Sequence, residues 1–252
     1  MMNMALEFYI IGAIAVLMTG ISKSGFAGGL GVLAVPAMSL FVTPQMAAAI
    51  ILPILVAMDI ANVWRYRRDW VRRAVYLLVP GAIIGIGIGA ATFHLFNPAM
   101  LKIGIGLLAL WFFANFLLQG RRSSAPRSFN GITITLAGMI SGLTSFIAHA
   151  GGPPVKGYLL SQNLEKSQFV GTNGVFFFLV NSLKVIPYVF LGQLTTESLQ
   201  ISLAFAPFVP VGIFIGFHLH KVVSQTVFTR VAYGFLLLSG FKLLWDGIAG
   251  VL

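Results

Sequence analysis

The sequence predicts an all-α polytopic membrane protein made of two inverted repeats of five segments each. Hydrophobic residues make up 58% of the 252-residue chain and charged residues only 9%, whereas soluble domains carry roughly 25% charged residues. So few charges cannot coat a soluble globule. At about 20 apolar residues per span, the length allows about eight full spans, or ten apolar segments. The third observation, an ordered set of matching positions in the two halves, predicts the duplication.

Ten apolar stretches divide the chain into the expected segments. They run over 5–22, 26–42, 45–64, 74–94, 99–119, 129–148, 152–162, 167–192, 198–219 and 225–250. Turn and breaker residues such as Thr43-Pro44 and Asn97-Pro98 separate them. The longest polar stretch, 121–130, predicts a cytoplasmic linker between a first transmembrane repeat over 1–120 and a second over 131–252.

Matching residues recur at a fixed spacing in the two halves. A shift of 122 positions pairs Gly20 with Gly142, Gly29 with Gly151, Asp59 with Asn181, Asn62 with Lys184 and Tyr66 with Tyr188. A shift of 127 positions then pairs Pro80 with Pro207, Gly85 with Gly212 and Gly89 with Gly216. Single matches mean little in so biased a composition, but the ordered set predicts an internal duplication.

Two arginine clusters predict the orientation. Five arginines lie between 65 and 73 and three between 121 and 127, and such clusters mark cytoplasmic loops. Counting segments outward from them places both termini and the Glu197 loop outside. The 65–73 loop is then inside while its equivalent near Glu197 is outside, so the repeats are predicted to be inverted.

The first two segments of each half leave two arrangements open. Stretches 5–42 and 129–162 can cross the bilayer twice, or they can form re-entrant hairpins that turn near the midplane. The hairpin is favoured in the second half because 152–162 is too short to span alone. Both arrangements leave the predicted orientation unchanged, and irregular backbone at this depth must line a protein-enclosed or watery cavity.

Glycine-rich motifs interrupt the apolar segments at equivalent places in the two halves. The first contains Ser24, Gly28, Gly29 and Gly31, and the second contains His149, Gly151 and Gly152. Glycines let backbone amides approach a ligand, and a helix that begins just after such a loop directs its positive dipole end at an anion. The alternative is that these glycines only allow close helix packing, the role expected for Gly81, Gly85, Gly87 and Gly89.

The two motifs also carry a family resemblance. They read GFAGGLGVLAVP in the first half and HAGGPPVKGYLL in the second. With the duplicated hydrophobic plan, they resemble the TauE/SafE family of bacterial membrane transporters, often called sulfite exporters, over essentially the whole chain. The resemblance implies a substrate among sulfite, organosulfonates or related small organic anions, and a place in the bacterial inner (plasma) membrane.

Ionisable and amide side chains within apolar segments are the candidate site residues, because their burial in a membrane is costly. Lys23, Lys156 and Lys184 share the sign that suits an anion, and snorkelling to the interface is the alternative. Asp59 is a candidate for proton coupling or for pairing with a buried lysine, and a tie to the arginine cluster is the alternative. His149 is a candidate for contact with the substrate or for proton coupling, and a hydrogen-bonded packing role is the alternative. Asn62, Asn173 and Asn181 are candidate oxyanion ligands, and interhelical hydrogen bonds are the alternative.

These observations predict a secondary transporter that exports or exchanges small anions by alternating access, driven by protons or by the membrane potential. A passive anion channel is the alternative, and an intramembrane hydrolase using Ser22 or Ser24 with His149 is a distant one. The expected partners are a small anion and the lipid bilayer, and no nucleic acid, because the basic residues are topogenic. No catalytic activity, cofactor or metal is expected, and the absence of cysteine excludes disulfides. The oligomeric state is not predicted.

Overall fold

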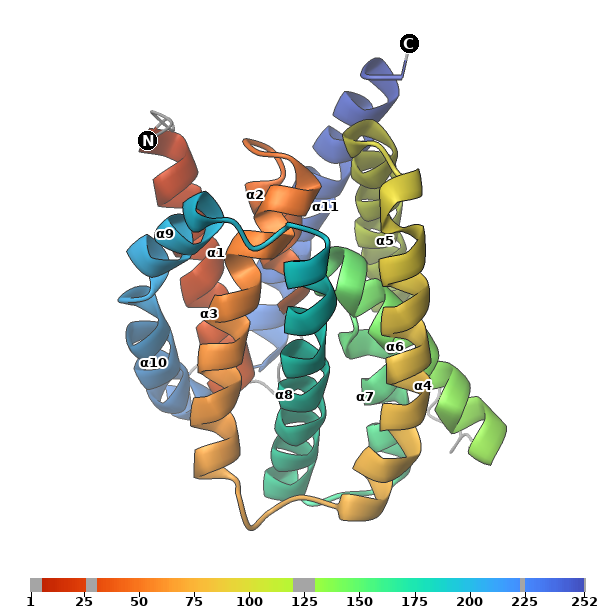
Figure 1. The fold of residues 1–252 in the computed structure, drawn as a ribbon. Helices are drawn as coiled ribbons and strands as arrows, with labels where there is room; N and C mark the ends of the chain where they lie inside the picture. The colour runs from red at the N-terminus through yellow and green to blue at the C-terminus, as the bar shows by residue number, and fades with distance from the viewer. Residues whose placement is uncertain (1–5, 26–30, 120–129, 223–224, 252) are drawn as a thin grey trace.

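The computed structural model describes residues 6–25, 31–119, 130–222 and 225–251, and every regular element in these ranges is a helix (Figure 1). The elements are α1 (Leu6–Gly25), η1 (Gly31–Leu33), α2 (Ala34–Met38), α3 (Pro44–Arg65), α4 (Arg72–Thr92), η2 (Phe93–Leu95), α5 (Pro98–Gln119), α6 (Gly131–Ala148), α7 (Gly152–Ser161), α8 (Lys166–Phe190), α9 (Thr196–Phe205), α10 (Phe208–Val222) and α11 (Gln225–Ala249). The all-α prediction is therefore confirmed for the described residues.

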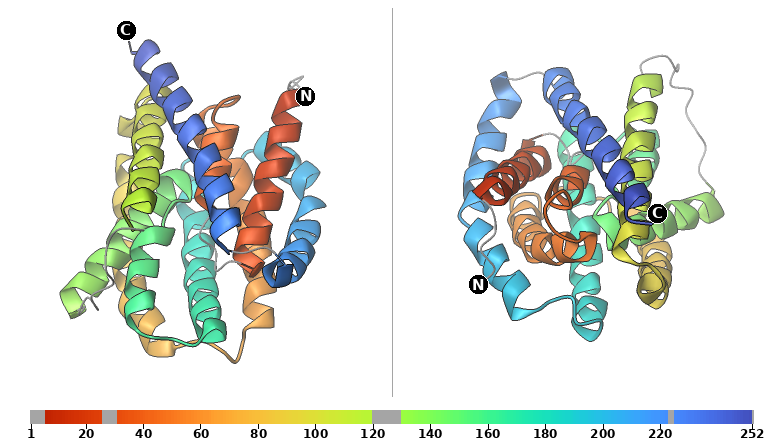
Figure 2. Two further views of the ribbon diagram at one scale, coloured as in Figure 1. Left: turned by 180° about the vertical axis from the view of Figure 1, so that it is seen from behind. Right: turned by 90° about the horizontal axis from the view of Figure 1, so that it is seen from above.

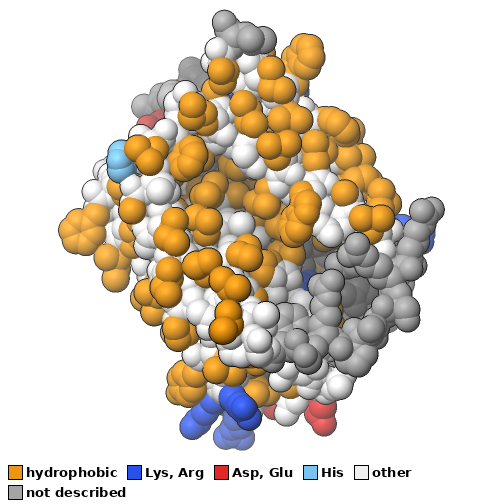
Figure 3. Space-filling model, turned by 90° about the vertical axis from the view of Figure 1, so that its right-hand side faces the viewer, with side chains coloured by type: hydrophobic (Ala, Val, Ile, Leu, Met, Phe, Trp, Pro, Cys, Tyr) orange, Lys and Arg blue, Asp and Glu red, His pale blue; other side chains and the backbone are white. Residues whose placement is uncertain are grey.

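Six of the described helices are long and apolar enough to cross a membrane: α1, α3, α4, α5, α6 and α8. The bent pair α9 and α10 gives a seventh candidate. Large apolar side chains such as Trp64, Phe190 and Trp245 are exposed, and apolar side chains cover most of the face in Figure 3. Such a surface suits lipid rather than water. The count of about eight full spans stays a prediction.

Two short helices, α2 and α7, lie where the glycine-rich motifs interrupt the chain. α2 has 5 residues and α7 has 10, so at about 1.5 Å per residue neither crosses a bilayer. In Figure 1, α6 rises from the lower end and α7 returns to it. On the other side of the molecule α1 descends from the upper end, and η1 and α2 lead back to it. Both termini lie at the upper end, opposite the connection between α3 and α4 (Figures 1 and 2).

Glycines allow two helix pairs to pack closely. α4 packs against α6, and α1 against α10. A Cβ on Gly85 would collide with the backbone of Met139 on α6. Across the other pair, a Cβ on Gly20 would lie 3.2 Å from the backbone of Gly212. Small residues therefore set the distance between these helices.

One of the four glycines expected to pack in this way does not. Gly81, Gly85 and Gly89 face α6, whereas a Cβ on Gly87 would have no described atom within 4 Å. The reason is helical periodicity: Gly81, Gly85 and Gly89 recur every four residues on one face, and Gly87 lies on the opposite, exposed face. The packing role expected for Gly87 is wrong.

Candidate functional site

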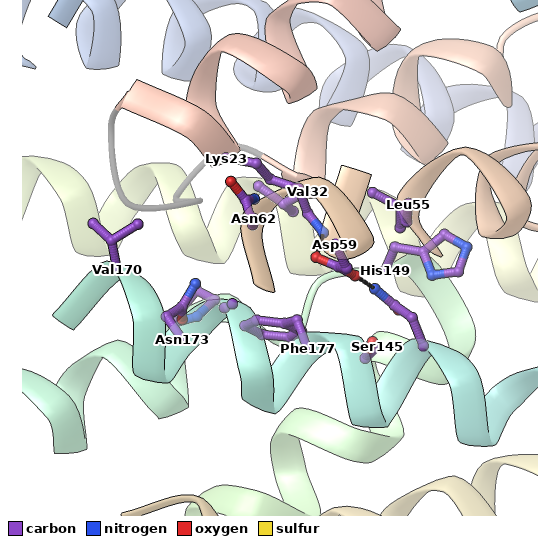
Figure 4. Close-up of a pocket in the computed structure, with 14 residues that line it drawn as sticks. Lys23, Val32, Leu55, Asp59, Asn62, Ser145, His149, Val170, Asn173 and Phe177 are labelled. Atoms are coloured by element: carbon purple, nitrogen blue, oxygen red, sulfur yellow. Dashed lines mark hydrogen bonds and ion pairs between the residues drawn. The ribbon is translucent and has the colours of Figure 1, made fainter. Parts of the chain in front are cut away.

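A pocket lies between the two central helices, α3 and α8, and the ends of α1, α6 and α7 close around it (Figure 4). Its polar lining residues are Lys23, Asp59, Asn62, Ser145, His149, Asn173 and Asn181, and the others are Val32, Leu55, Gly152, Pro153, Val170, Gly174 and Phe177. The cavity volume is about 30 Å³, which is room for a water-sized group. A larger ligand therefore requires side chains to move.

Helical periodicity brings the lining residues of α3 and α8 into register. Leu55, Asp59 and Asn62 follow one another at spacings of four and three, so they share one face of α3. Asn173, Phe177 and Asn181 follow at spacings of four on α8. The two stripes face each other across the pocket in Figure 4.

Asp59 is the centre of the charged network. It is 1% exposed and forms an ion pair with Lys23 from the last turn of α1. Its second oxygen accepts a 2.6 Å hydrogen bond from Nδ2 of Asn181. Because a buried carboxylate needs a partner for each oxygen, these two contacts compensate the burial of Asp59 within an apolar protein. Lys23 is in turn neutralised by Asp59.

Lys184 is the second buried cation, with 0% exposure. Its ammonium donates to the carbonyl and to the hydroxyl of Ser145, both at 2.9 Å, and to Nδ1 of His149 at 2.6 Å. These three acceptors match the three N–H groups of an ammonium. Lys184 does not line the pocket itself, but two of its partners do.

The partners of His149 define its tautomer. Nδ1 accepts from Lys184, while Nε2 lies 2.9 Å from the carbonyl oxygen of Ala48 on α3. A carbonyl only accepts, so Nε2 carries the proton and the ring is neutral. The hydroxyl of Ser145 accepts from Lys184, which leaves its own proton available for an acceptor in the pocket.

The turn after α6 places His149 between α3 and α8. His149 caps α6 in the left-handed conformation, with φ of 52°, which is uncommon for a residue other than glycine. The following Gly151 packs against α6, where a Cβ would meet the Ser141 carbonyl oxygen at 2.6 Å. Gly152, at the start of α7, lines the pocket. The positive dipole end of α7 therefore lies beside the pocket.

Three amide oxygens around the pocket are unsatisfied. Oδ1 of Asn62, Asn173 and Asn181 is buried and accepts no hydrogen bond within the described part of the chain. Leaving a buried carbonyl oxygen without a donor costs about 1–3 kcal/mol. The pocket thus holds unused hydrogen-bonding capacity, which a ligand or water can satisfy.

A layer of aromatic rings lies beyond one end of the pocket. Tyr188 lies one turn beyond Lys184 on α8, is 1% exposed, and donates a 2.6 Å hydrogen bond to the carbonyl of Phe146. Its ring contacts those of Phe146 and His149. The lining residues of α8 all lie on the other side of Lys184, from Val170 to Asn181. The pocket therefore extends toward the end of the molecule that carries the 65–73 loop.

Seven of the fourteen expected site residues line this pocket. They are Lys23, Asn62, His149, Gly152, Asn173, Asn181 and the coupling candidate Asp59, and Lys184 lies just behind Ser145 and His149.

Other expected residues lie away from the pocket lining. Lys156 is half-buried on α7, and Gly151 packs against α6. Ser24 donates to backbone carbonyls of Gly20 and, on α10, Ile213. Gly31 begins η1, and Gly28 and Gly29 lie outside the described residues. The bonds of Ser24 and His149 to separate partners give no support for a hydrolase built on this pair.

Ser145 and Phe177 are among the lining residues that the sequence analysis did not single out. A signal for Ser145 existed, because the 122-residue shift that pairs Asp59 with Asn181 also pairs Lys23 with Ser145. Phe177 carries no signal of its own, since phenylalanine is abundant in the chain. Its position between Asn173 and Asn181 on one helical face would have identified it.

Fold and site together define a helical membrane protein that encloses a charged pocket between its two central helices. The sequence matches the family described as Sulfite exporter TauE/SafE over residues 12–243. The chain belongs to this family, which confirms the resemblance noted from the two glycine motifs. Membership indicates a membrane transporter for sulfite or another anion. No curated protein and no solved structure matches the chain.

Proposed function

We propose that this protein is a secondary transporter that exports or exchanges small anions, such as sulfite or organosulfonates, by alternating access. The observation that carries the proposal is the pocket itself: two ammonium groups and one carboxylate lie buried within apolar helices. Ionisable groups at such depth are costly and are characteristic of transport pathways. The family assignment supports an anion as the substrate.

The charge of the pocket matches a monovalent anion. With Lys184 protonated, Lys23 and Lys184 contribute two positive charges and Asp59 one negative charge, while His149 is neutral by its hydrogen bonds. In this protonation state the net charge is +1, and one bound monoanion neutralises it. Because an uncompensated buried charge is unfavourable, this balance stabilises the loaded pocket over the empty one.

Two inverted repeats would provide the alternating access. The pocket is lined by α1, η1 and α3 from the first half and by their sequence equivalents α6, α7 and α8 from the second. The hydrogen bond between Asp59 and Asn181 joins two residues that are 122 positions apart, the shift that aligns the halves. The close pairs α4 with α6 and α10 with α1 are also equivalent, because the shift of 122 relates α1 to α6 and the shift of 127 relates α4 to α10. These correspondences support rocking of one repeat against the other.

Aromatic residues near the two ends of the pocket supply a gate for this motion. Tyr188 lies beyond the end remote from the 65–73 loop, and its repeat equivalent Tyr66 lies toward the other end, half-buried. Burial raises the pKa of Tyr66, opposed by the charge of Arg65, so its phenol stays protonated and able to donate. In the opposite state, Tyr66 closes its end of the pocket while Tyr188 releases Phe146.

The arginine-rich loop faces the cytoplasm in this proposal, with both termini outside and the protein in the bacterial inner membrane. The membrane potential, negative inside, then favours export of a monoanion by about 2.3 kcal/mol per 100 mV. The chain lacks native cysteine, so single cysteines at Arg68 and Thr196 test the orientation without background. An impermeant thiol reagent added outside should label only the cysteine at Thr196. Labelling of both or only of Arg68→Cys contradicts the orientation.

Counterflow in proteoliposomes tests the transport function. Vesicles loaded with unlabelled sulfite should transiently accumulate labelled sulfite against its gradient, because a carrier exchanges one anion for another. A passive anion channel gives equilibration without accumulation, and that result would replace the carrier with the channel alternative. Vesicles without protein give the leak, which must be subtracted.

A further inference from the structure

We propose that Asn181 makes the pocket select anions that carry a hydrogen-bond donor, such as hydrogen sulfite, over anions of equal charge that carry none. The proposal rests on the anion-binding function proposed above and names the substrate class of that pocket. It concerns protonated oxyanions and other monoanions with an O–H or N–H group.

The orientation of the Asn181 amide is determined by Asp59. Asp59 forms an ion pair with Lys23, and the carboxylate of an ion pair only accepts hydrogen bonds. The atom of Asn181 that lies 2.6 Å from Asp59 must therefore be the NH₂ nitrogen. Oxygen and nitrogen of a free amide can exchange places, but here the exchange would set two acceptors against each other.

The carbonyl oxygen of Asn181 is left as an acceptor without a donor. Asn181 is 2% exposed and lines the pocket, and its Oδ1 has no hydrogen bond to any described residue. Asn62 and Asn173 also have an unpaired Oδ1 at the pocket. Among the described contacts, the NH₂ groups of Asn62 and Asn173 do not bind a carboxylate, so these two amides can rotate and donate N–H to an oxyanion. The Asn181 amide is bound to Asp59 and cannot rotate in this way.

The pocket therefore offers donors and one fixed acceptor to the same ligand. The Ser145 hydroxyl, oriented by Lys184, can donate to an anion oxygen, and the Asn181 oxygen requires a donor in return. A monoanion with one protonated oxygen satisfies both and also matches the net charge of +1. A fully deprotonated anion leaves the Asn181 oxygen unpaired, which weakens its binding.

Two pairs of anions test this preference. Hydrogen sulfite and chlorate are both pyramidal monoanions, but only hydrogen sulfite carries an acidic proton. Bicarbonate and nitrate are both planar monoanions, and only bicarbonate has an O–H group. Calorimetry on the purified full-length protein, at a mildly acidic pH where hydrogen sulfite predominates, should give a dissociation constant about tenfold lower for hydrogen sulfite than for chlorate. Bicarbonate against nitrate, measured near neutral pH, should differ in the same direction.

Asn181→Leu is the variant that tests the residue, and Asn173→Leu is its matched control on the same face of α8. The chlorate-to-hydrogen-sulfite ratio of dissociation constants should fall to about one in Asn181→Leu and stay near tenfold in Asn173→Leu. Because the ratio compares two ligands on one protein, a general loss of stability or affinity cancels.

The outcomes separate this inference from the proposed function. Equal affinities within each pair in the wild type would overturn the selection while leaving an anion-binding pocket in place; a water molecule on Asn181 would produce this result. A preference that persists in Asn181→Leu would also overturn the role of Asn181. Failure of all four anions to bind would contradict both the inference and the proposed function.

Discussion

Lys184→Met gives the clearest test of the charge account. Lys184 is fully buried, lies in no ion pair of the described chain, and reaches the pocket through Ser145 and His149. Met keeps most of the side-chain length and removes only the ammonium. The pocket then loses one of its two positive charges, so its net charge falls from +1 to zero.

The size of the effect follows from Coulomb's law. An anion bound to the Ser145 hydroxyl lies on the order of 6 Å from the Lys184 ammonium, and at an effective dielectric constant of about 20 the attraction is about 3 kcal/mol. At about 1.4 kcal/mol per decade, its loss weakens binding about a hundredfold. Lys156→Met is the matched control because Lys156 lies outside the pocket lining. A charge that makes no direct contact should change affinity by less than about fivefold.

Calorimetric titration of both variants with sulfite, at matched pH and ionic strength, gives the two dissociation constants. Size-exclusion chromatography in detergent checks that each variant is folded. An unchanged dissociation constant in folded Lys184→Met would refute the charge account. An equal loss in both variants would show that overall basicity, rather than the pocket, binds the anion.

Three further predictions concern stability and gating. Lys23→Met should destabilise the protein by about 3–5 kcal/mol because it strands the Asp59 carboxylate; adding Asp59→Asn should recover most of this in thermal unfolding, and no recovery would contradict the buried pair. Gly85→Ala should lower the melting temperature, whereas Gly87→Ala should leave it unchanged or raise it, and equal losses would contradict the packing seen on α4. Tyr188→Phe removes the hydrogen bond that closes the gate, so exchange should be faster than in wild type in counterflow, and an unchanged rate would remove Tyr188 from the gate.

Much of the helical plan could be predicted from the sequence because apolar stretches and breakers are local signals. The short segment predicted over 152–162 agrees with the bounds of α7. The pairing of Asp59 with Asn181 was visible as a shift of 122 positions, and the two side chains are hydrogen-bonded. The shift does not predict that Asp59 and Asn181 are in contact, since equivalent positions in two repeats need not lie close together.

The direction in which each side chain points was harder to predict. The place of Lys156 after the second glycine motif predicts contact with an anion, yet Lys156 does not line the pocket. The motif also predicts that Gly151 offers backbone to the ligand, but Gly151 packs against Ser141. Whether Lys156 and Gly151 face the pocket depends on the rotation of α7 about its axis. Packing with α6 and α8 sets this rotation, and the sequence of the motif does not predict it.

Locating the bound anion tests directly whether the pocket between α3 and α8 is the binding site. Selenite is an electron-rich analogue of sulfite, and its anomalous signal in crystals of the full-length protein marks where it binds. We expect a single strong peak in the pocket between α3 and α8, within hydrogen-bonding distance of the Ser145 hydroxyl or of Lys23. A peak beside Lys156 or at the arginine-rich loop, with none in the pocket, would contradict this expectation.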